Sequence, residues 1–473
     1  MSRIPPASED LRVNRQAIAQ DRQDLQTPFL SIHGNGRLNV SRQLDEVGDD
    51  RMGGDNVGGK GGTPAICCGS GLIGSRVSKS RPGAPAAAPF LLLAAFVCAG
   101  AAAAQQPSPS PAPAPVAAPL TTPSLSGPLA AAPPIQIDAG PLGKLDVDGV
   151  VSGMGLVENN HGATDDTGQA ALSNAQVWVQ KPDGWWQFYV QAGAYNVLSI
   201  GLPYLSTQKN VSELWGPVPF AWLKLAPGKS TSILIGSLPP LMGAESTFGF
   251  QNMNIERGLL WNQENSVNRG VQVNQTWGKL TASLSWNDGY YSNRYSWLSG
   301  SLTYASGPHS LSFQAMGNLS QTGFETLATP VENNGSMYAV VYTWTKGSWV
   351  VQPYWQYSAV PTNAKIGVAS GASTQGGAVL LTRAFHHGLA LSGRGEFIAS
   401  TGSAGEGSVN LMYGPGSAAW SATATPTFQK GRFFVRGDIS FVHANRITPE
   451  DAFGAAGNDA SQARVVVEVG FLF

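Results

Sequence analysis

The chain has 473 residues, of which only 12% are charged, and it carries 57 glycines, 13 tryptophans and a formal net charge of −1. This charged share is about half of that in a soluble domain, so polarity comes from Ser, Thr, Asn, Gln and Gly, which suit a wet lumen. The small net charge gives no reason to expect a nucleic-acid partner. All three cysteines (Cys67, Cys68 and Cys98) lie in the first hundred residues, so the remaining chain has no disulfide or thiolate metal site, and no cofactor is expected.

The first part of the chain is predicted to hold a targeting signal. Residues 1–75 are polar and without period, which predicts disorder. Residues 76–104 read as a signal peptide, with basic residues, an apolar run at 90–98 and small residues at 102–104 before a cleavage point. Because such a peptide normally begins a chain, we expect a start codon assigned too far upstream. A long leader and a transmembrane anchor are the alternatives.

Residues 105–140 are rich in proline and alanine, which predicts an extended periplasmic linker without a core of its own. From residue 141 to residue 473 the texture changes, because short runs of alternating apolar and polar residues recur. This alternation is typical of strands that have two different faces. Residues 141–473 are therefore predicted to form the folded part of the protein.

Tight turns join these runs in pairs, because Gly and Pro supply the backbone angles that short turns require. The turns fall at residues 181–184, 226–229, 278–279, 306–308, 346–347, 386–388 and 430–431. Long polar connections separate the pairs, and this asymmetry is typical of outer-membrane barrels. We therefore predict an all-β fold, a closed antiparallel transmembrane β-barrel of about 16 strands (14 to 18), with short periplasmic turns and long extracellular loops. Residues 408–428 are taken as one bulged strand.

Alternation also assigns the two faces of the predicted strands. In the last strand, apolar residues from Val465 to Phe473 share one face and Glu468 lies on the other. Because a charge facing lipid is costly, the apolar face is predicted to meet lipid and Glu468 to face the lumen. The same argument turns five more charged residues inward: Arg394, Glu396, Arg432, Arg436 and Asp438. A soluble β-sandwich would also alternate, but it would not combine a signal peptide, an aromatic C-terminus and the absence of cysteine.

The longest connection, residues 237–268, carries Glu245, Glu256 and Arg257 beside apolar residues that include Phe248 and Phe250. Exposed loops rarely hold so many apolar side chains, so we predict that this loop folds inward and narrows the pore. Opposed acids and bases in a pore orient polar solutes and tune ion selectivity. The alternative is that these charges pair with each other and stiffen the wall.

Four segments resemble the OmpL-like β-barrel porins of proteobacteria: residues 235–245, 268–273, 286–289 and 434–441. The resemblance covers roughly residues 146–473 and implies passive diffusion of small solutes, with no catalytic residues. The C-terminal residues Phe471 and Phe473 also resemble the signal that the barrel-assembly machinery reads during biogenesis.

These features predict a porin of the outer membrane, exported through the periplasm and surrounded by lipid, that passes small polar solutes or ions. A homotrimer is compatible with this class. A plugged structural or adhesive barrel is the first alternative. An outer-membrane hydrolase is the second, but none of the six histidines is flanked by a nucleophile motif, so no enzyme is expected.

Overall fold

The computed structural model describes residues 124–473 apart from residues 164 and 324. The predicted disordered segment 1–75, the predicted signal peptide 76–104 and residues 105–123 of the predicted linker lie outside the described residues. Within the described part, no helix is long and apolar enough to cross a membrane.

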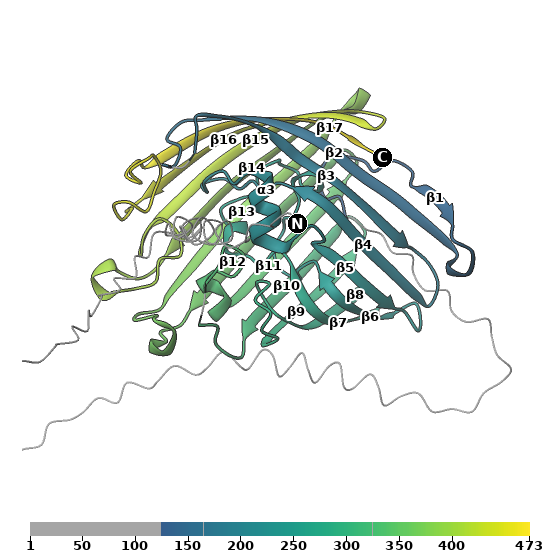
Figure 1. Ribbon diagram of the computed structural model, residues 1–473, viewed down its shortest axis with the longest axis horizontal. Coiled ribbons are helices and arrows are strands. Elements are labelled where there is room, and N and C mark those ends of the chain that lie inside the picture. Colours follow the sequence, from purple (N-terminus) through teal and green to yellow (C-terminus); the bar gives the residue numbers. More distant parts are fainter. Residues whose placement is uncertain (1–123, 164, 324) are drawn as a thin grey trace, which may run out of the picture. The chain divides into compact units, whose positions relative to one another are not determined.

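Sixteen strands, β2 to β17, form a closed antiparallel barrel in which each strand pairs with its neighbours in sequence (Figure 1). This confirms the predicted fold. The strands are β2 (Lys144–Glu158), β3 (Gly168–Lys181), β4 (Trp186–Tyr195), β5 (Phe220–Leu225), β6 (Thr231–Leu238), β7 (Asn268–Trp277), β8 (Leu280–Asn287), β9 (Trp297–Ser306), β10 (His309–Asn318), β11 (Ser336–Lys346), β12 (Trp349–Val360), β13 (Ala372–Ala384), β14 (Leu389–Ser400), β15 (Ala418–Lys430), β16 (Phe433–Asn445) and β17 (Ser461–Leu472).

The last strand closes the barrel against the first, with Val465 opposite Val157 and Phe471 opposite Val151. At the end of this seam the backbones of Gly149 and Phe473 exchange two hydrogen bonds, of 2.8 and 3.0 Å. Closure gives each of the sixteen strands a neighbour on both sides, which satisfies the backbone polar groups that a bilayer cannot.

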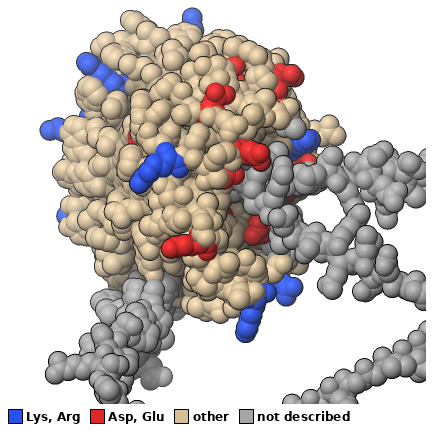
Figure 2. All heavy atoms as spheres, turned by 90° about the vertical axis from the view of Figure 1, so that its left-hand side faces the viewer, with Lys and Arg blue, Asp and Glu red and all other residues tan. Residues whose placement is uncertain are grey.

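Short turns and long loops alternate around the ring, as predicted. The long loops carry the short helical segments α3 (Thr207–Asn210), η2 (Val211–Trp215), η3 (Gly249–Gln251), η4 (Trp261–Gln263), η5 (Val331–Asn334), η6 (Ala364–Ile366) and η8 (Ala404–Glu406), whereas η7 (His386–Gly388) forms a short turn. Figure 2 shows the end of the barrel that carries the long loops, where charged side chains stand singly on a mostly uncharged surface.

The prediction of one bulged strand over residues 408–428 is wrong in its first half. Strand β15 begins only at Ala418, and the preceding residues belong to the β14–β15 loop. Gly414 and Gly416 adopt φ values of 104° and 78°. Such positive φ angles lie outside the strand region of the backbone, so the chain turns there instead of extending.

Exposure confirms the two faces of the last strand. Val465, Val467 and Val469 are 48%, 47% and 41% exposed on the outer face, whereas Val466 and Glu468 are fully buried. The outer band is therefore apolar and suited to lipid. On the inner side, buried side chains of the strands pack against residues of the connection between β6 and β7, such as Phe248 and Leu260.

The end of the predicted linker differs from the expectation of an extended spacer. Residues Ile135–Asp138 form a short strand, β1, that pairs with the start of β2, and η1 (Gly140–Leu142) makes the turn between them. Strand β2 extends beyond the last residue of its neighbour β17, which leaves a few backbone groups of β2 without a partner strand. Strand β1 covers this exposed edge.

Candidate functional site

The loop between β6 and β7, residues 239–267, lies inside the barrel and is called the inner loop below. Phe248, Phe250, Glu256, Arg257 and Leu260 in this loop are fully buried. The apolar side chains of the loop drive this burial, because they lose contact with water only where the barrel wall surrounds them. The prediction that the loop folds inward is thus met, and its effect on solute passage is taken up below.

Apolar clusters join the inner loop to several sides of the wall. Phe250 stacks on Trp178 of β3, with ring centres 5.8 Å apart. Leu260 packs in a cluster with wall residues of β11 to β16 such as Leu380 and Ile398, and Ile255 packs with residues of β2 and β17. Buried apolar contacts on opposite sides hold the loop across the lumen.

The middle of the loop is folded by its own polar groups. The Asn252 side chain accepts a hydrogen bond from the backbone N–H of Ser246 at 2.6 Å and donates to the Ser246 carbonyl at 2.8 Å. The Gln251 side chain accepts from the backbone N–H of Phe248 at 3.2 Å, which caps the short helix η3. Buried backbone groups of the loop thereby obtain partners without a strand neighbour.

One group of buried charges ties the loop to β14. Arg394 donates from Nη1 to Oε1 of Glu245 at 2.8 Å and to the backbone carbonyl of Glu256 at 2.6 Å. Its Nε lies 3.2 Å from Oε1 of Glu396, two residues along the same strand. The predicted inward pair of β14 is thus brought together with a predicted residue of the loop.

A second group ties the loop to β16, β17 and β2. Arg464 donates to Oε1 of Glu256 at 2.8 Å and to Oε2 of Glu158 at 2.6 Å. Ser440 donates to the other oxygen of Glu256 at 2.6 Å, and the backbone N–H of Glu256 donates to Asp438 at 2.8 Å. Glu256 therefore has partners on two wall strands and fixes the loop at this point.

A third group surrounds Arg436, which donates to three backbone carbonyls of the loop: Gly249 at 3.0 Å, Asn252 at 2.8 Å and Met253 at 3.0 Å. Its Nη1 is also 3.9 Å from Oε2 of Glu468. The other oxygen of Glu468 accepts hydrogen bonds from three polar residues of β2 and β3: Ser152, Ser173 and Asn174.

Arg257 differs from the other buried arginines. Its guanidinium group is fully buried, and within the described residues none of its three nitrogens has a hydrogen-bond partner. It lies over the ring of Trp261, 5.0 Å from the ring centre, which provides a cation–π contact. Burial lowers the pKa of Arg257 to about 10, so the group stays charged at neutral pH. Burial likewise raises the pKa of the loop carboxyls Glu245 and Glu264.

Of the charged residues that were predicted to face the lumen, Arg432 does not, so this prediction is wrong. It lies in the turn between β15 and β16, exposed to solvent, because β16 begins one residue later at Phe433. Two buried partners were missed, Arg464 and Glu158. Both could have been found by alternation, since Arg464 shares the parity of Glu468 in β17 and Glu158 that of the inward residues of β2. No group of three or more His, Cys, Asp or Glu within the described chain could hold a metal ion.

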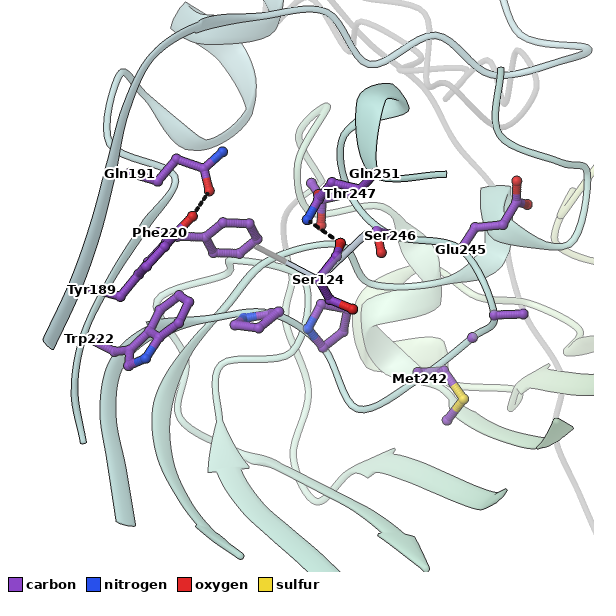
Figure 3. Close-up of a pocket in the computed structure, with 14 residues that line it drawn as sticks. Ser124, Tyr189, Gln191, Phe220, Trp222, Met242, Glu245, Ser246, Thr247 and Gln251 are labelled. Atoms are coloured by element: carbon purple, nitrogen blue, oxygen red, sulfur yellow. Dashed lines mark hydrogen bonds between the residues drawn. The ribbon is translucent and has the colours of Figure 1, made fainter. Parts of the chain in front are cut away.

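A cavity of about 210 Å³ lies beside the inner loop (Figure 3). Tyr189, Phe220 and Trp222 of β4 and β5 form one side of it, and Pro239, Pro240, Met242, Gly243, Ala244, Glu245, Ser246, Thr247 and Gln251 of the loop line much of the rest. The rings of Tyr189 and Trp222 stack with centres 4.4 Å apart. An aromatic wall facing polar loop groups is typical of a small-solute site.

Toward the end with short turns, inward positions of β6 to β12 are partly open to solvent. Leu234 and Val350 among them are apolar, and the polar ones are uncharged: Ser232, Asn274, Thr281, Ser301, Thr303, Ser312, Gln314, Thr343 and Gln352. Gln314 of this wall accepts a hydrogen bond from the backbone N–H of Gly243 at 2.8 Å, so the polar wall continues to the edge of the inner loop. Polar solutes can hydrogen-bond along such a surface without a strong field.

Solved structures with a similar architecture are outer-membrane proteins of low sequence identity. DcaP, an outer membrane channel of Acinetobacter baumannii, is 14% identical with a TM-score of 0.49, and covers 72% of this chain and 100% of its own. OmpT of Vibrio cholerae is 9% identical with a TM-score of 0.48, with the same coverage. OmpF of Salmonella typhi is 13% identical with a TM-score of 0.46, again with the same coverage. No curated protein matches the sequence.

The sequence matches a protein family directly. The family described as "Putative beta-barrel porin-2, OmpL-like" matches residues 144–473, which is the whole barrel from the first residue of β2. The membrane location follows, because this is a family of outer-membrane porins. The chain belongs to the OmpL-like β-barrel porin family.

Proposed function

We propose that the protein lets small hydrophilic solutes or ions diffuse passively across the outer membrane, along a narrow route beside the inner loop. The observation that carries this proposal is the placement of the loop, which crosses a barrel whose partly open inner surface over β6 to β12 carries uncharged polar side chains. The lumen of a wide water-filled pore would leave its wall charges exposed, whereas here they are buried against the loop. Selection by size is therefore expected to dominate over selection by charge.

The buried charges have a holding role in this proposal. Arg394, Glu396, Arg436, Asp438 and Glu468 on the wall, and Glu245 and Glu256 on the loop, form contacts that keep the loop in place. Arg257 contributes through its backbone, which exchanges hydrogen bonds with Leu198 and Ile200 at 3.0 and 2.9 Å. The two interpretations of these charges, as wall-stiffening pairs and as pore-lining groups, then describe two positions of the loop. The charges pair while the loop is seated, and they line the passage and meet a solute when the loop shifts.

Planar-bilayer conductance and liposome swelling with sugars of graded size test the proposal. Deleting residues 248–256 removes the part of the loop that fills the lumen, and we expect higher single-channel conductance and uptake of larger sugars. Deleting Ala404–Glu406, an exposed turn of a long loop, is the control and should change neither. Unchanged conductance in a folded loop-deletion variant would argue against the proposal.

A plugged structural or adhesive barrel remains the second candidate, and the apolar clusters between loop and wall favour it. In that case the wild-type protein would admit neither sugars nor ions, and its long loops would bind a partner. The two candidates separate on the wild-type protein alone, because a narrow porin still conducts small ions. No enzymatic activity is proposed, in keeping with the porin family.

Biogenesis is part of the same proposal. We infer export through the periplasm, recognition of Phe471 and Phe473 by the barrel-assembly machinery, and lipid around the outer band. Phe471 is 53% exposed on the outer face, which leaves its ring open to a partner during assembly. A homotrimer is proposed as the assembled form, and chemical cross-linking in the membrane, followed by denaturing electrophoresis, would report it.

A further inference from the structure

Residues 124–130 lie in the barrel before the chain reaches β1, and are called the strap below. At one end, Ala130 is bound to Gln429 near the short turn between β15 and β16. The Ala130 N–H donates to Oε1 of Gln429 at 2.8 Å, and Nε2 of Gln429 donates to the Ala130 carbonyl at 2.8 Å. This two-bond clamp fixes the strap to the wall at the end of the barrel that carries the short turns.

At its other end the strap is bound to the inner loop. The backbone N–H groups of Ser126 and Gly127 donate to the carbonyl of Gln251 at 2.8 and 3.2 Å, and the Ser126 hydroxyl donates to the same oxygen at 3.0 Å. The Gln251 side chain returns a hydrogen bond to the Ser124 carbonyl at 3.2 Å (Figure 3). The strap therefore bridges the wall at β15 and the middle of the inner loop.

The strap packs closely against the inner loop and the wall. Leu129 is only 3% exposed, and Leu125 packs against the cluster that contains Phe248 and Phe250 of the inner loop. A Cβ atom on Gly127 would lie 2.0 Å from the carbonyl oxygen of Asn252, so any larger residue there must push strap and loop apart. The close approach needs glycine at this position.

The strap also lies on the proposed solute route. Ser124 lines the cavity between the aromatic residues of β4 and β5 and the inner loop, where it lies between Phe220 and Gln251 (Figure 3). The strap continues from this cavity to the clamp at Gln429, on the side that faces the short turns. A solute that leaves the cavity toward that side meets the strap.

The two obstacles in the lumen are held by bonds of different strength. The inner loop is held by ion pairs and hydrogen bonds to arginine, whereas the hydrogen bonds of the strap join only neutral groups. Hydrogen bonds with a charged partner are about twice as strong as neutral ones. The strap should therefore leave its place before the inner loop does.

We propose that the strap is a tethered plug that closes the cavity toward the periplasmic end of the barrel and opens by leaving its two anchors. This inference rests on the proposed porin function and adds the means by which passage is regulated. Because the strap directly follows the proline-rich segment in the sequence, a force applied to that segment would act on the strap before the inner loop.

The test uses the full chain with Gly127→Leu, which forces the strap from the inner loop. In planar bilayers we expect about a tenfold rise in the ratio of open to closed time, equivalent to about 1.4 kcal/mol. Gly228→Leu is the matched control, because Gly228 lies in a short turn where an added Cβ atom would have no other atom within 4 Å, and it should behave as wild type. The variant Gln429→Leu removes the clamp, together with one hydrogen bond of 3.1 Å from Gln429 to the Gly431 carbonyl in the adjacent turn, and should raise the ratio in the same direction.

The outcomes separate this inference from the function on which it rests. If Gly127→Leu and Gln429→Leu both gate as wild type while the loop-deletion variant conducts more, the strap is no plug and the porin proposal stands. If none of the variants conducts, the porin proposal fails. If Gly127→Leu does not fold, judged by its migration on gels before and after heating, Gln429→Leu decides, and an unchanged ratio overturns the plug.

Discussion

Arg464 is the residue whose loss should disturb the interior most, because it joins three separate parts of the chain. Its guanidinium group contacts Glu158 of β2 at 2.6 Å and Glu256 of the inner loop at 2.8 Å. It also donates to the backbone carbonyls of Ser199 at 3.1 Å and Leu202 at 3.0 Å, in the β4–β5 loop. The change Arg464→Met keeps most of the volume and removes the charge.

The expected magnitude follows from the burial of both carboxylates. Glu158 and Glu256 are 3% and 0% exposed, so without Arg464 each loses a partner that water cannot replace. Breaking a buried ion pair from one side costs about 3–5 kcal/mol. We therefore expect Arg464→Met to lower the free energy of unfolding by about this amount. Adding Glu158→Gln and Glu256→Gln should restore most of the loss, because no unpaired charge then remains buried.

Urea unfolding of the barrel refolded in lipid vesicles, followed by tryptophan fluorescence, measures these differences. Arg383→Met is the control. Arg383 is exposed on the outside of β13 and lies 5.0 Å from the ring centre of Trp349, so its loss should cost about 1 kcal/mol or less. A loss below about 1 kcal/mol for Arg464→Met, or no recovery in the triple variant, would refute the role given to these ion pairs.

Three further expectations concern the outer face, the loop and the seam. Val467→Arg places a charge at the middle of the outer face of β17, where Val467 is 47% exposed, and should lower the unfolding free energy by about 2–4 kcal/mol, whereas Val467→Phe should be tolerated. Burial raises the pKa of Glu264, so the folded state favours its protonated form. The free energy of unfolding should therefore fall as the pH rises above the ordinary pKa of glutamate. The variant Glu264→Gln should weaken this fall, which urea titrations from about pH 5 to about pH 8 would measure. Deleting Phe473 removes the two backbone hydrogen bonds to Gly149 at the seam. The share of the protein that reaches the membrane as a folded barrel, seen as a change in gel migration on heating, should therefore drop. An unchanged share would contradict a role of Phe473 in assembly.

The class of the fold could be predicted from the sequence because its signals are local. A strand turns successive side chains to opposite faces, so alternation in residues such as Val465 to Glu468 shows which face is apolar without any knowledge of the partner strand. The short turns depend on Gly and Pro within a few residues, and the structure has them where they were expected. The same local rules would have identified Arg464, which lies four residues before Glu468 on the same face.

Local rules failed where a boundary or a long-range contact decided the outcome. Arg432 has the parity of Arg436, but it precedes the first residue of β16 and remains in the turn. The segment before β15 looked like a bulged strand, and the backbone angles of Gly414 and Gly416 made it a loop.

The contacts of the lumen depended on tertiary structure alone. Arg394 meets Glu245 across 149 positions of sequence, and Ala130 meets Gln429 across 299. No periodicity links such distant residues, because they become neighbours only when β17 closes against β2 and the inner loop enters the ring. The sequence by itself therefore determined that this chain forms a membrane barrel and which side of each strand faces lipid. Closure of the ring decided what fills it, since the occupants of the lumen are held by side chains that only a closed wall brings within reach.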